Sequence, residues 1–392
     1  MKNIEKIANL LKEANEKKVI VQDVEVFGYQ FNYNVKVLGS VSKYWFGKHE
    51  VIEYIAPLNS ESNNDNRPGT KKTSTQYVVV HDTASAAETA NSLAHAKYVS
   101  NGGGGTSWHY SSGSDGIYHQ IPDDEVAYHA GDALVVPFSL TNTGIKGKIT
   151  NPKVEIKNGY YYINDEKSFI KSPKITFMLG EDKNLHYASD GFIQSRKAPE
   201  GAKEGEEFLG DNSRRINEQG IRIDLGEDGY YYMGPTYYNA GFGYISNRGG
   251  NLNSIGIETM VNKGSDLYLT WQKTAKLVAH LLKDNNLSLD RVKQHHFFSG
   301  KDCPETMSHA KLWDNFMELV KFEYEILLLS DGVEIEFISN SNLIDKTGRV
   351  ITLPSSDTII DYSVVIRDIN TKEEIKVDLK TVVEGEWWNI EN

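Results

Sequence analysis

The segment Tyr77-Val78-Val79-Val80-His81 holds an unbroken apolar run that is followed by a histidine. A strand that is apolar at every position is typical of a sheet buried on both faces, because helices cover both sides of such a sheet. Binding and catalytic residues of open α/β sheets lie at the carboxyl ends of the strands. The segment therefore predicts an α/β domain and places His81 where a ligand would bind.

Three helices are predicted after this strand along the chain. Apolar residues recur at helical spacing over residues 85–100, 267–283 and 312–320, which indicates three helices that pack on a sheet. Asn101 and the glycine run that follows it are expected to end the first helix. Together these elements predict a mixed central β-sheet flanked by helices.

A second strand, predicted over residues 254–258, carries a charged side chain. Ser254, Gly256 and Glu258 share one face of it, because side chains alternate between the two faces of a sheet. Gly256 leaves room beside the carboxylate. A charged residue at the inner end of such a strand needs a reason, so Glu258 is a candidate functional residue.

The segment His295-His296-Phe297-Phe298-Ser299-Gly300-Lys301-Asp302-Cys303-Pro304 contains the single cysteine of the chain. Imidazole and thiolate are both good zinc ligands, and His295 reaches the same ion as Cys303 if Ser299-Gly300 turns the chain back. Lys301 precedes Cys303 by two residues, so both side chains share a face in an extended segment. Taken alone, the segment fits a small buried cysteine and two loop histidines better than a metal site.

Composition limits the class of protein. The 392 residues are enough for about two or three domains. A content of 39% hydrophobic and 24% charged residues is typical of a soluble globular protein, and no apolar run is long enough to span a bilayer. The formal net charge of -12 argues against nucleic acid as the main partner. The charged start Met1-Lys2-Asn3-Ile4-Glu5-Lys6 predicts no cleavable secretory signal, and one cysteine excludes an internal disulfide.

Residues 1–70 predict a small N-terminal α+β segment that ends in a linker. Apolar residues at helical spacing indicate an amphipathic helix over residues 4–14. Strict alternation of apolar and polar residues predicts a half-buried strand over residues 29–37. The polar run over residues 60–69 is expected to be a linker or a long loop, because it has no face to bury.

The remainder divides into a core, an insertion and a tail. Residues 71–325 contain the α/β core, interrupted over about 133–250 by a β-rich inserted subdomain in which a strand-turn-strand pattern occurs twice, at 154–162 and 221–232. Residues 326–392 predict a C-terminal all-β module that resembles a β-sandwich. Wall attachment, spacing and dimerisation are open alternatives for this module. The strands expected in and just before it are 325–329, 333–338, 350–353, 358–366 and 375–379.

Four segments, in this order, carry a resemblance to a known family: VVVHDTAS, SWHYSSGSDGIYHQIPDDEVAYHAGD, NSIGIET and HHFFSGKDCP. They resemble the zinc-dependent N-acetylmuramoyl-L-alanine amidases of the type 2 family, which also contains phage lysozyme-type amidases and the animal peptidoglycan recognition proteins. The resemblance covers about residues 77–131 and 251–320. Four ordered motifs are stronger evidence than any one of them, so the metal hypothesis for the cysteine segment gains support.

The resemblance implies a metal site and a reaction. Matched residue by residue, the zinc ligands of the family fall on His81, His295 and Cys303. Its catalytic carboxylate falls on Glu258, and its lysine falls on Lys301. Three ligands and an open position would make the zinc a Lewis acid that activates water. The bond implied is the amide between the lactyl group of N-acetylmuramic acid and the L-alanine of the stem peptide.

Two more residues are implied at the substrate groove. His129 matches a histidine at its mouth, and Trp108 stands where some members carry a catalytic tyrosine, which moves the general-base role onto Glu258. His296 is the alternative to His295 as a ligand, because neighbouring residues on a strand point to opposite faces.

The function expected from the resemblance is that of a cell-wall hydrolase acting on peptidoglycan or its muropeptides. A phage endolysin released through a holin, or an autolysin exported by a dedicated route, would reconcile a wall target with the absent signal. One alternative is a peptidoglycan-binding protein without catalysis; another is an intracellular amidase that recycles wall fragments. Species, stem-peptide chemistry and oligomeric state are not predicted by the sequence.

Overall fold

The computed structural model groups the chain into two compact units. The first comprises Met1–His129, Asn251–Lys293 and Asp314–Asn392, and the second comprises Ala130–Gly250 and Gln294–Trp313. The predicted insertion lies in the second unit, whereas no unit boundary falls at residue 70 or 325, so the three-part division of the chain remains a prediction. The structure describes residues 2–137, 141–149, 152–171, 175–180, 182–189, 192–208, 223–226, 228–233, 242–246 and 248–386.

A six-stranded mixed sheet with the strand order β20-β5-β19-β6-β7-β4 confirms the predicted α/β class. Strand β19 is parallel to both β5 and β6, and β7 runs antiparallel to β6. The three valines of β5 are fully buried, as expected for a strand covered on both faces. The strands are β4 (Ile52–Glu53), β5 (Tyr77–Asp82), β6 (Tyr110–Gly113), β7 (Gly116–His119), β19 (Ser254–Thr259) and β20 (Val292–Gln294).

Helices pack on this sheet. Helix α3 (Ser92–Asn101) contacts β6 and β7, and α6 (Leu267–Asp284) contacts β6 and β19. Helix α3 starts seven residues later than predicted, because the side chain of Asn91 accepts a hydrogen bond from the Ala94 N–H and so caps the helix there. Among the described helices, none has the length and the apolar character needed to cross a membrane.

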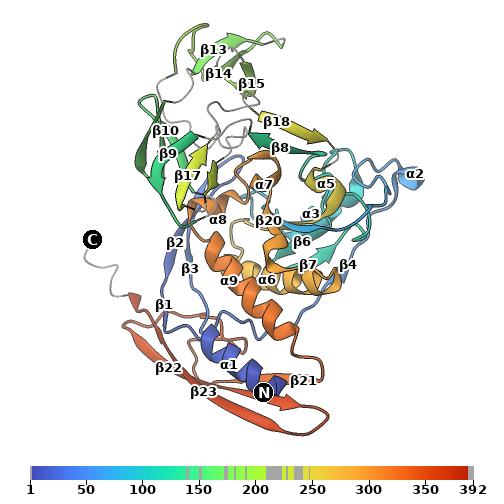
Figure 1. Cartoon of the computed structure of the whole chain (residues 1–392), viewed down its shortest axis with the longest axis vertical. Coiled ribbons are helices and arrows are strands. Elements are labelled where there is room, and N and C mark those ends of the chain that lie inside the picture. The colour runs from blue at the N-terminus through green and yellow to red at the C-terminus, as the bar shows by residue number, and fades with distance from the viewer. Residues whose placement is uncertain are drawn as a thin grey trace. The chain divides into compact units, whose positions relative to one another are not determined.

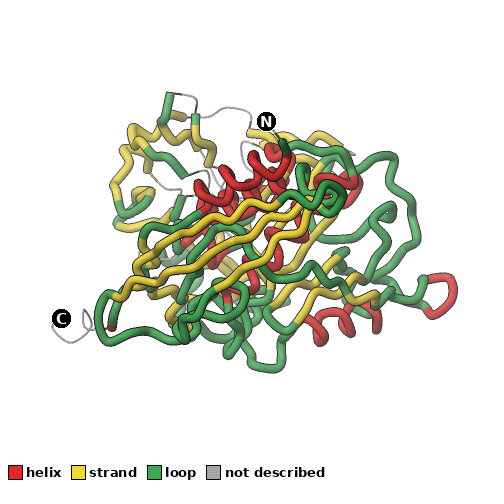
Figure 2. The backbone as a smooth tube through the Cα atoms, turned by 90° about the horizontal axis from the view of Figure 1, so that it is seen from below, coloured by secondary structure: helices red, strands yellow, loops and turns green. Residues whose placement is uncertain are grey.

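The two ends of the chain share a second sheet with the order β1-β23-β22-β21 (Figure 1). Its long strands lie side by side near the C-terminus (Figure 2). Strand β1 pairs in parallel with β23, and α1 packs on β22 and β23. The elements are α1 (Asn3–Ala14), β1 (Lys18–Val19), β21 (Val333–Ile338), β22 (Thr358–Asp368) and β23 (Glu374–Val383).

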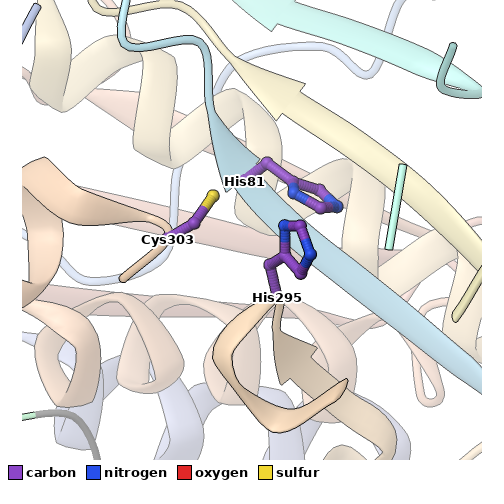
Figure 3. A group of neighbouring side chains, drawn as sticks. All are labelled: His81, His295 and Cys303. Carbon is purple, nitrogen blue, oxygen red and sulfur yellow. The ribbon is translucent and has the colours of Figure 1, made fainter. Parts of the chain in front are cut away.

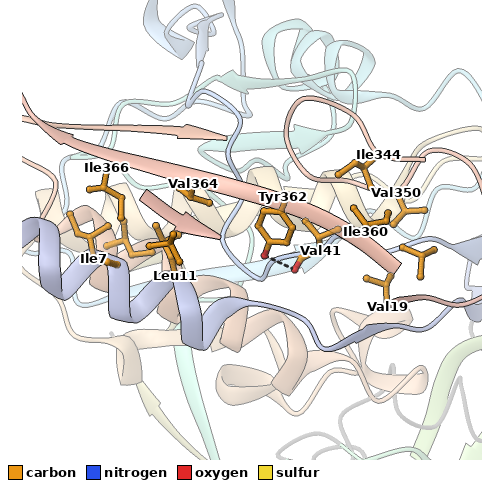
Figure 4. Close-up of a cluster of buried hydrophobic side chains, with 14 of the residues drawn as sticks. Ile7, Leu11, Val19, Val41, Ile344, Val350, Ile360, Tyr362, Val364 and Ile366 are labelled. Carbon is orange, nitrogen blue, oxygen red and sulfur yellow. Dashed lines mark hydrogen bonds between the residues drawn. The ribbon is translucent and has the colours of Figure 1, made fainter. Parts of the chain in front are cut away.

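One hydrophobic core joins these terminal elements (Figure 4). Ile7 and Leu11 of α1 lie in the same cluster as Ile360 and Tyr362 of β22. The hydroxyl of Tyr362 donates a hydrogen bond to the Val41 carbonyl at 3.2 Å. The predicted β-sandwich over residues 326–392 is therefore wrong, because the tail forms one sheet that α1 packs on and β1 completes.

Two expected strands of the tail are also absent as strands. Residues 325–327 belong to the last turn of α9 (Trp313–Leu327), so the predicted strand at 325–329 is wrong. Val350 forms only an isolated bridge with Ile344. The remaining predicted strands of the tail, at 333–338, 358–366 and 375–379, are confirmed.

A β-hairpin, formed by β2 (Gln22–Val26) and β3 (Tyr33–Val37), follows β1. The predicted strand over residues 29–37 is correct only from Tyr33 onward. Tyr29 and Phe31 lie in the turn of the hairpin and are exposed.

The polar run over residues 60–69 is not a linker. It contains a short helix, α2 (Asn59–Ser62), and Asn64 and Asn66 are buried. The side-chain amides of both asparagines donate to the Val99 carbonyl, at 3.1 and 3.5 Å, and Asn64 also donates to Ser100. These carbonyls belong to the last turn of α3 and have no partner within the helix, so polar side chains are buried here because they complete its C-terminus.

The described part of the second unit is β-rich, as predicted for the insertion. Its sheets are β10-β11-β12, β13-β14-β15, β16-β17-β9 and β18-β8. Tyr161, Tyr187 and Tyr231 are buried in its hydrophobic core, so these tyrosines have a packing role. Residues 221, 222 and 227 of the second strand-turn-strand pattern lie outside the described residues.

The bounds of these strands are β8 (Ala133–Pro137), β9 (Thr141–Lys146), β10 (Val154–Lys157), β11 (Tyr160–Ile163), β12 (Glu166–Lys171), β13 (Ile175–Leu179), β14 (Leu185–Ser189), β15 (Phe192–Lys197), β16 (Ile223–Leu225), β17 (Tyr230–Met233) and β18 (Phe242–Ser246). Both predicted strand-turn-strand patterns correspond to described strand pairs, β10 with β11 and β16 with β17. The described residues also include the short helices α5 (Gly250–Asn253), α7 (His296–Ser299) and α8 (Glu305–His309) and the 3-10 helix η1 (Leu289–Arg291).

Candidate metal centre

His81 and Glu258 occupy facing positions on the parallel strands β5 and β19. Neighbouring strands lie about 4.8 Å apart, and residues paired across them point to the same face, so the two side chains lie next to each other. His81 is buried and Glu258 is half-buried. The structure thus brings a histidine and a carboxylate together at the carboxyl ends of the strands, where the sequence predicted a site.

His129 supports the ring of His81. Its Nδ1 atom lies 2.9 Å from His81 Nε2, and its Nε2 atom lies 3.4 Å from the Ser254 hydroxyl. Burial, with a contribution from Lys72, lowers the pKa of His129 to about 3, so this imidazole is neutral near pH 7. In the tautomer in which His129 donates its Nε2–H to Ser254, its Nδ1 accepts the proton of His81 Nε2, and Nδ1 of His81 is then the atom left for a metal. A metal-ligating histidine commonly donates its other ring N–H in this way.

The imidazole of His129 fills the space that Gly256 leaves. A Cβ atom on Gly256 would lie 2.6 Å from His129 Nδ1 and 2.7 Å from its Cε1 and Cγ atoms. The sequence predicted room beside Glu258 at this glycine, and the structure places a second histidine there.

His109 holds strand β19 through two hydrogen bonds to the backbone of Gly256. Its Nδ1 accepts the Gly256 N–H at 3.0 Å, and its own N–H donates to the Gly256 carbonyl at 3.0 Å. Burial holds the pKa of His109 well below its usual value. The role of His109 is therefore structural.

The predicted turn between His295 and Cys303 is confirmed. Helix α7 ends at Gly300, which has a positive φ of 73°. A glycine adopts this left-handed conformation without steric cost. The chain then turns back, so that the His296 N–H faces the Cys303 carbonyl at 3.4 Å. The ring of His296 lies 3.2 Å from the Ile223 carbonyl, so this histidine is held by the backbone of β16.

Three side chains form the candidate metal site (Figure 3). The ligand atoms of His81, His295 and Cys303 all lie within 4.8 Å of one another. Zinc binds histidine nitrogen at about 2.0–2.1 Å and cysteine sulfur at about 2.3 Å. Ligand atoms around one such ion are closer than 4.8 Å to each other, so the two imidazoles and the thiol fit zinc both by chemistry and by spacing.

The other two predicted residues differ in exposure. Lys301 is exposed, and its backbone N–H donates to the Ser299 hydroxyl at 3.3 Å. Trp108 is only 8% exposed, donates to the Ser111 hydroxyl at 2.8 Å, and stacks on Tyr98 with ring centroids 5.8 Å apart. A role of either residue toward substrate remains a prediction.

A second group was not identified from the sequence. Ligand atoms of Asp302, Glu305 and His309 also lie within 4.8 Å of one another, and His309 Nε2 lies 2.7 Å from Asp302 Oδ2. Asp302 and Glu305 are buried. The spacing of Glu305 and His309 on one turn of α8 was the signal available for this group.

Residues 71–167 match a family described as N-acetylmuramoyl-L-alanine amidase. The chain is therefore similar to that family over about a quarter of its length. The matched segment includes His81, Trp108 and His129, whereas Glu258, His295 and Cys303 lie outside it.

Two curated relatives carry the same family name. The N-acetylmuramoyl-L-alanine amidase CwlH of Bacillus subtilis (strain 168) is 44% identical over 69 residues, which is 18% of this chain and 27% of that protein. XlyA of the same organism is 43% identical over 82 residues, which is 21% of this chain and 26% of that protein. The chain thus matches about a quarter of the length of these relatives. The solved structure of the catalytic domain of XlyA aligns with 69% of this chain and 99% of its own, at a TM-score of 0.36 and 21% identity.

Proposed function

We propose that the protein is a peptidoglycan hydrolase that uses zinc to cleave the amide between N-acetylmuramic acid and the L-alanine of the stem peptide. The observation that carries this proposal is the grouping of His81, His295 and Cys303, with Glu258 beside His81 on the next strand. The names of the matched relatives support the choice of bond. The place of action that follows from this substrate is the cell wall.

His81, His295 and Cys303 would hold the zinc ion, which would supply Lewis acidity for the activation of water. Glu258 accepts the proton of the attacking water and passes it to the leaving amine. His129 takes the Nε2–H of His81 and so fixes the orientation of that ring. Lys301 is exposed, and we propose that its ammonium stabilises the negative charge that develops on the former carbonyl oxygen.

Incubation with purified sacculi tests the proposal. Mass spectrometry of the products should show stem peptides with a new free amino group on L-alanine, together with glycan strands that carry free lactyl carboxylates. Cleavage at any other bond would contradict the assigned activity. Sacculi that are bound without any new termini would indicate a peptidoglycan-binding protein without catalysis.

Glu258→Gln separates these outcomes at the level of one residue. It keeps the shape of the side chain and removes its ability to accept a proton, so turnover should fall about 100-fold or more. Zinc content and binding to sacculi should stay as in the wild type. Unchanged turnover would remove Glu258 from the mechanism. If the loss of activity is matched by an equal loss of folded protein, Glu258 has a structural role.

A further inference from the structure

The turn of the β2–β3 hairpin presents two aromatic side chains to solvent. Tyr29 is 83% exposed and Phe31 is 44% exposed. Single exposed apolar residues are ordinary on protein surfaces, whereas two aromatic rings on one short turn form a small apolar patch. The rings are carried by a hairpin whose position is fixed at two points.

The first point is next to the candidate metal site. The backbone N–H of Tyr29 donates to the Ala84 carbonyl at 2.6 Å, and Ala84 lies three residues after His81. Gly28 allows this close approach, since a Cβ atom there would lie 2.5 Å from the Cβ of Ala86. The turn is therefore docked on the loop that leaves β5.

The second point follows the neighbouring strand. The hydroxyl of Tyr33 donates to the Val261 carbonyl at 2.6 Å, and Val261 lies three residues after Glu258. Burial raises the pKa of Tyr33 to about 12, so the phenol keeps its proton and remains a donor at neutral pH. The hairpin is therefore also docked on the loop that leaves β19.

Both points lie beyond the same edge of the sheet, because His81 and Glu258 face each other on parallel strands. Three residues of chain span at most about 10 Å, so the turn lies near the proposed zinc ligand His81 and the proposed base Glu258. We propose that Tyr29 and Phe31 form a saccharide-binding subsite that holds the glycan strand beside the amide to be cleaved. This subsite rests on the proposed function, since it names the part of the substrate that the hairpin contacts.

The charges of the hairpin favour a sugar over the stem peptide. Lys36 is the one basic residue in the segment 22–37, and it forms an ion pair with Asp23 at 3.3 Å. Glu25 accepts a hydrogen bond from Asn32 at 3.0 Å. A stem peptide with its carboxylates would meet acidic side chains here. A pyranose ring is uncharged and has an apolar C–H face, which matches a flat aromatic ring, and the tyrosine hydroxyl adds a polar contact.

The double variant Tyr29→Ala/Phe31→Ala tests the subsite by comparing two substrates. One is a soluble glycan strand of several disaccharides with stem peptides, and the other is an N-acetylmuramoyl peptide without a second sugar. KM for the glycan strand should rise about tenfold, the scale expected for the loss of two aromatic contacts. Its kcat should stay constant, because the contact is equal in the ground state and the transition state. Both parameters for the single-sugar substrate should be unchanged.

Phe169→Ala is the matched control, since Phe169 is also an exposed aromatic residue, at 65% exposure, and belongs to the other unit. It should leave both substrates unaffected. The double variant keeps the backbone N–H that anchors residue 29, so the hairpin should stay docked, and an unchanged melting temperature verifies this. An equal rise of KM for both substrates would assign the rings to the peptide and overturn the subsite, as would an unchanged KM for the glycan strand.

Calorimetric titration with oligomers of N-acetylglucosamine, which are uncharged glycan strands without peptides, separates this inference from the proposed function. The wild type should bind these strands, and the double variant should bind them about tenfold more weakly. Equal binding by the two proteins would overturn the subsite. An absence of amide cleavage by the wild type on every substrate would overturn the proposed function, while a difference in glycan binding would still support the subsite.

Discussion

Replacing Gly256 with alanine should weaken metal binding without altering a ligand. The new Cβ atom would lie 2.6–2.7 Å from three atoms of the His129 ring. Non-bonded carbon atoms pack at about 3.5–4.0 Å, so the ring must move by about 1 Å. A shift of that size is enough to break the 2.9 Å hydrogen bond between His129 Nδ1 and His81 Nε2.

The size of the effect follows from the role of that hydrogen bond. Loss of the group that orients a metal-ligating histidine typically costs 10–100-fold in metal affinity. This corresponds to about 1.4–2.7 kcal/mol. The overpacked core should also lower the stability of the metal-free protein by about 1–3 kcal/mol. Competition with a zinc chelator measures the first quantity, and thermal unfolding in the presence of chelator measures the second.

A double-mutant cycle identifies the cause. His129→Ala should itself weaken zinc binding by a similar factor, because it also removes the partner of His81. Adding Gly256→Ala to His129→Ala should then cost nothing more, since the ring that the methyl group meets is gone. If Gly256→Ala weakens zinc binding equally in both backgrounds, or in neither, the reasoning about the imidazole is refuted.

Four further outcomes are expected. Cys303→Ser should lose the metal, and full zinc occupancy by elemental analysis would remove Cys303 from the site. Lys301→Ala should lower turnover with zinc retained, and equal kcat values for variant and wild type would contradict its role. Burial and a neighbouring histidine lower the pKa of His49 to about 4, so the unfolded chain binds a proton at His49 more tightly than the folded chain does. The contribution of His49 to stability should therefore be present above about pH 6.5 and lost as the pH falls toward 4. Over this pH range the melting temperature of His49→Gln should fall less than that of the wild type. Removal of all residues after Tyr324 should leave α1 without its partner sheet, and rapid proteolysis of residues 2–37 would verify this, whereas full protection would contradict it.

The candidate site was largely predictable because its signals are local in the sequence. A valine run that ends in His81, a charged residue at the inner end of a strand, and one cysteine near two histidines each mark an unusual position. The four ordered motifs then indicated that these residues belong to one site. The contact of His129 with Gly256 was not predictable, because it joins residues on distant segments that only the sheet brings together.

The fold was predictable wherever periodicity decides it. Helices α1 and α6 and strand β19 follow from spacing alone. The errors occur where a distant partner decides the structure. Tyr29 and Phe31 continue the alternation of a strand, yet they lie in a turn, and the tail completes its sheet with β1, which no pattern within the tail reveals. The buried Asn64 and Asn66 satisfy carbonyls of α3, which composition does not show.

The sheet shared by the two ends of the chain has a consequence for how the protein is made. Lys18 pairs with Val382, so β1 cannot pair with its neighbour until the residues of β23 have left the ribosome. During synthesis the apolar side of α1 stays exposed to solvent until β22 and β23 have been made. Contacts of such long sequence separation form slowly, because a large loop has to close first. Chains that end before β23 would leave this helix uncovered and open to proteolysis. The terminal sheet therefore protects only chains that were translated through β23.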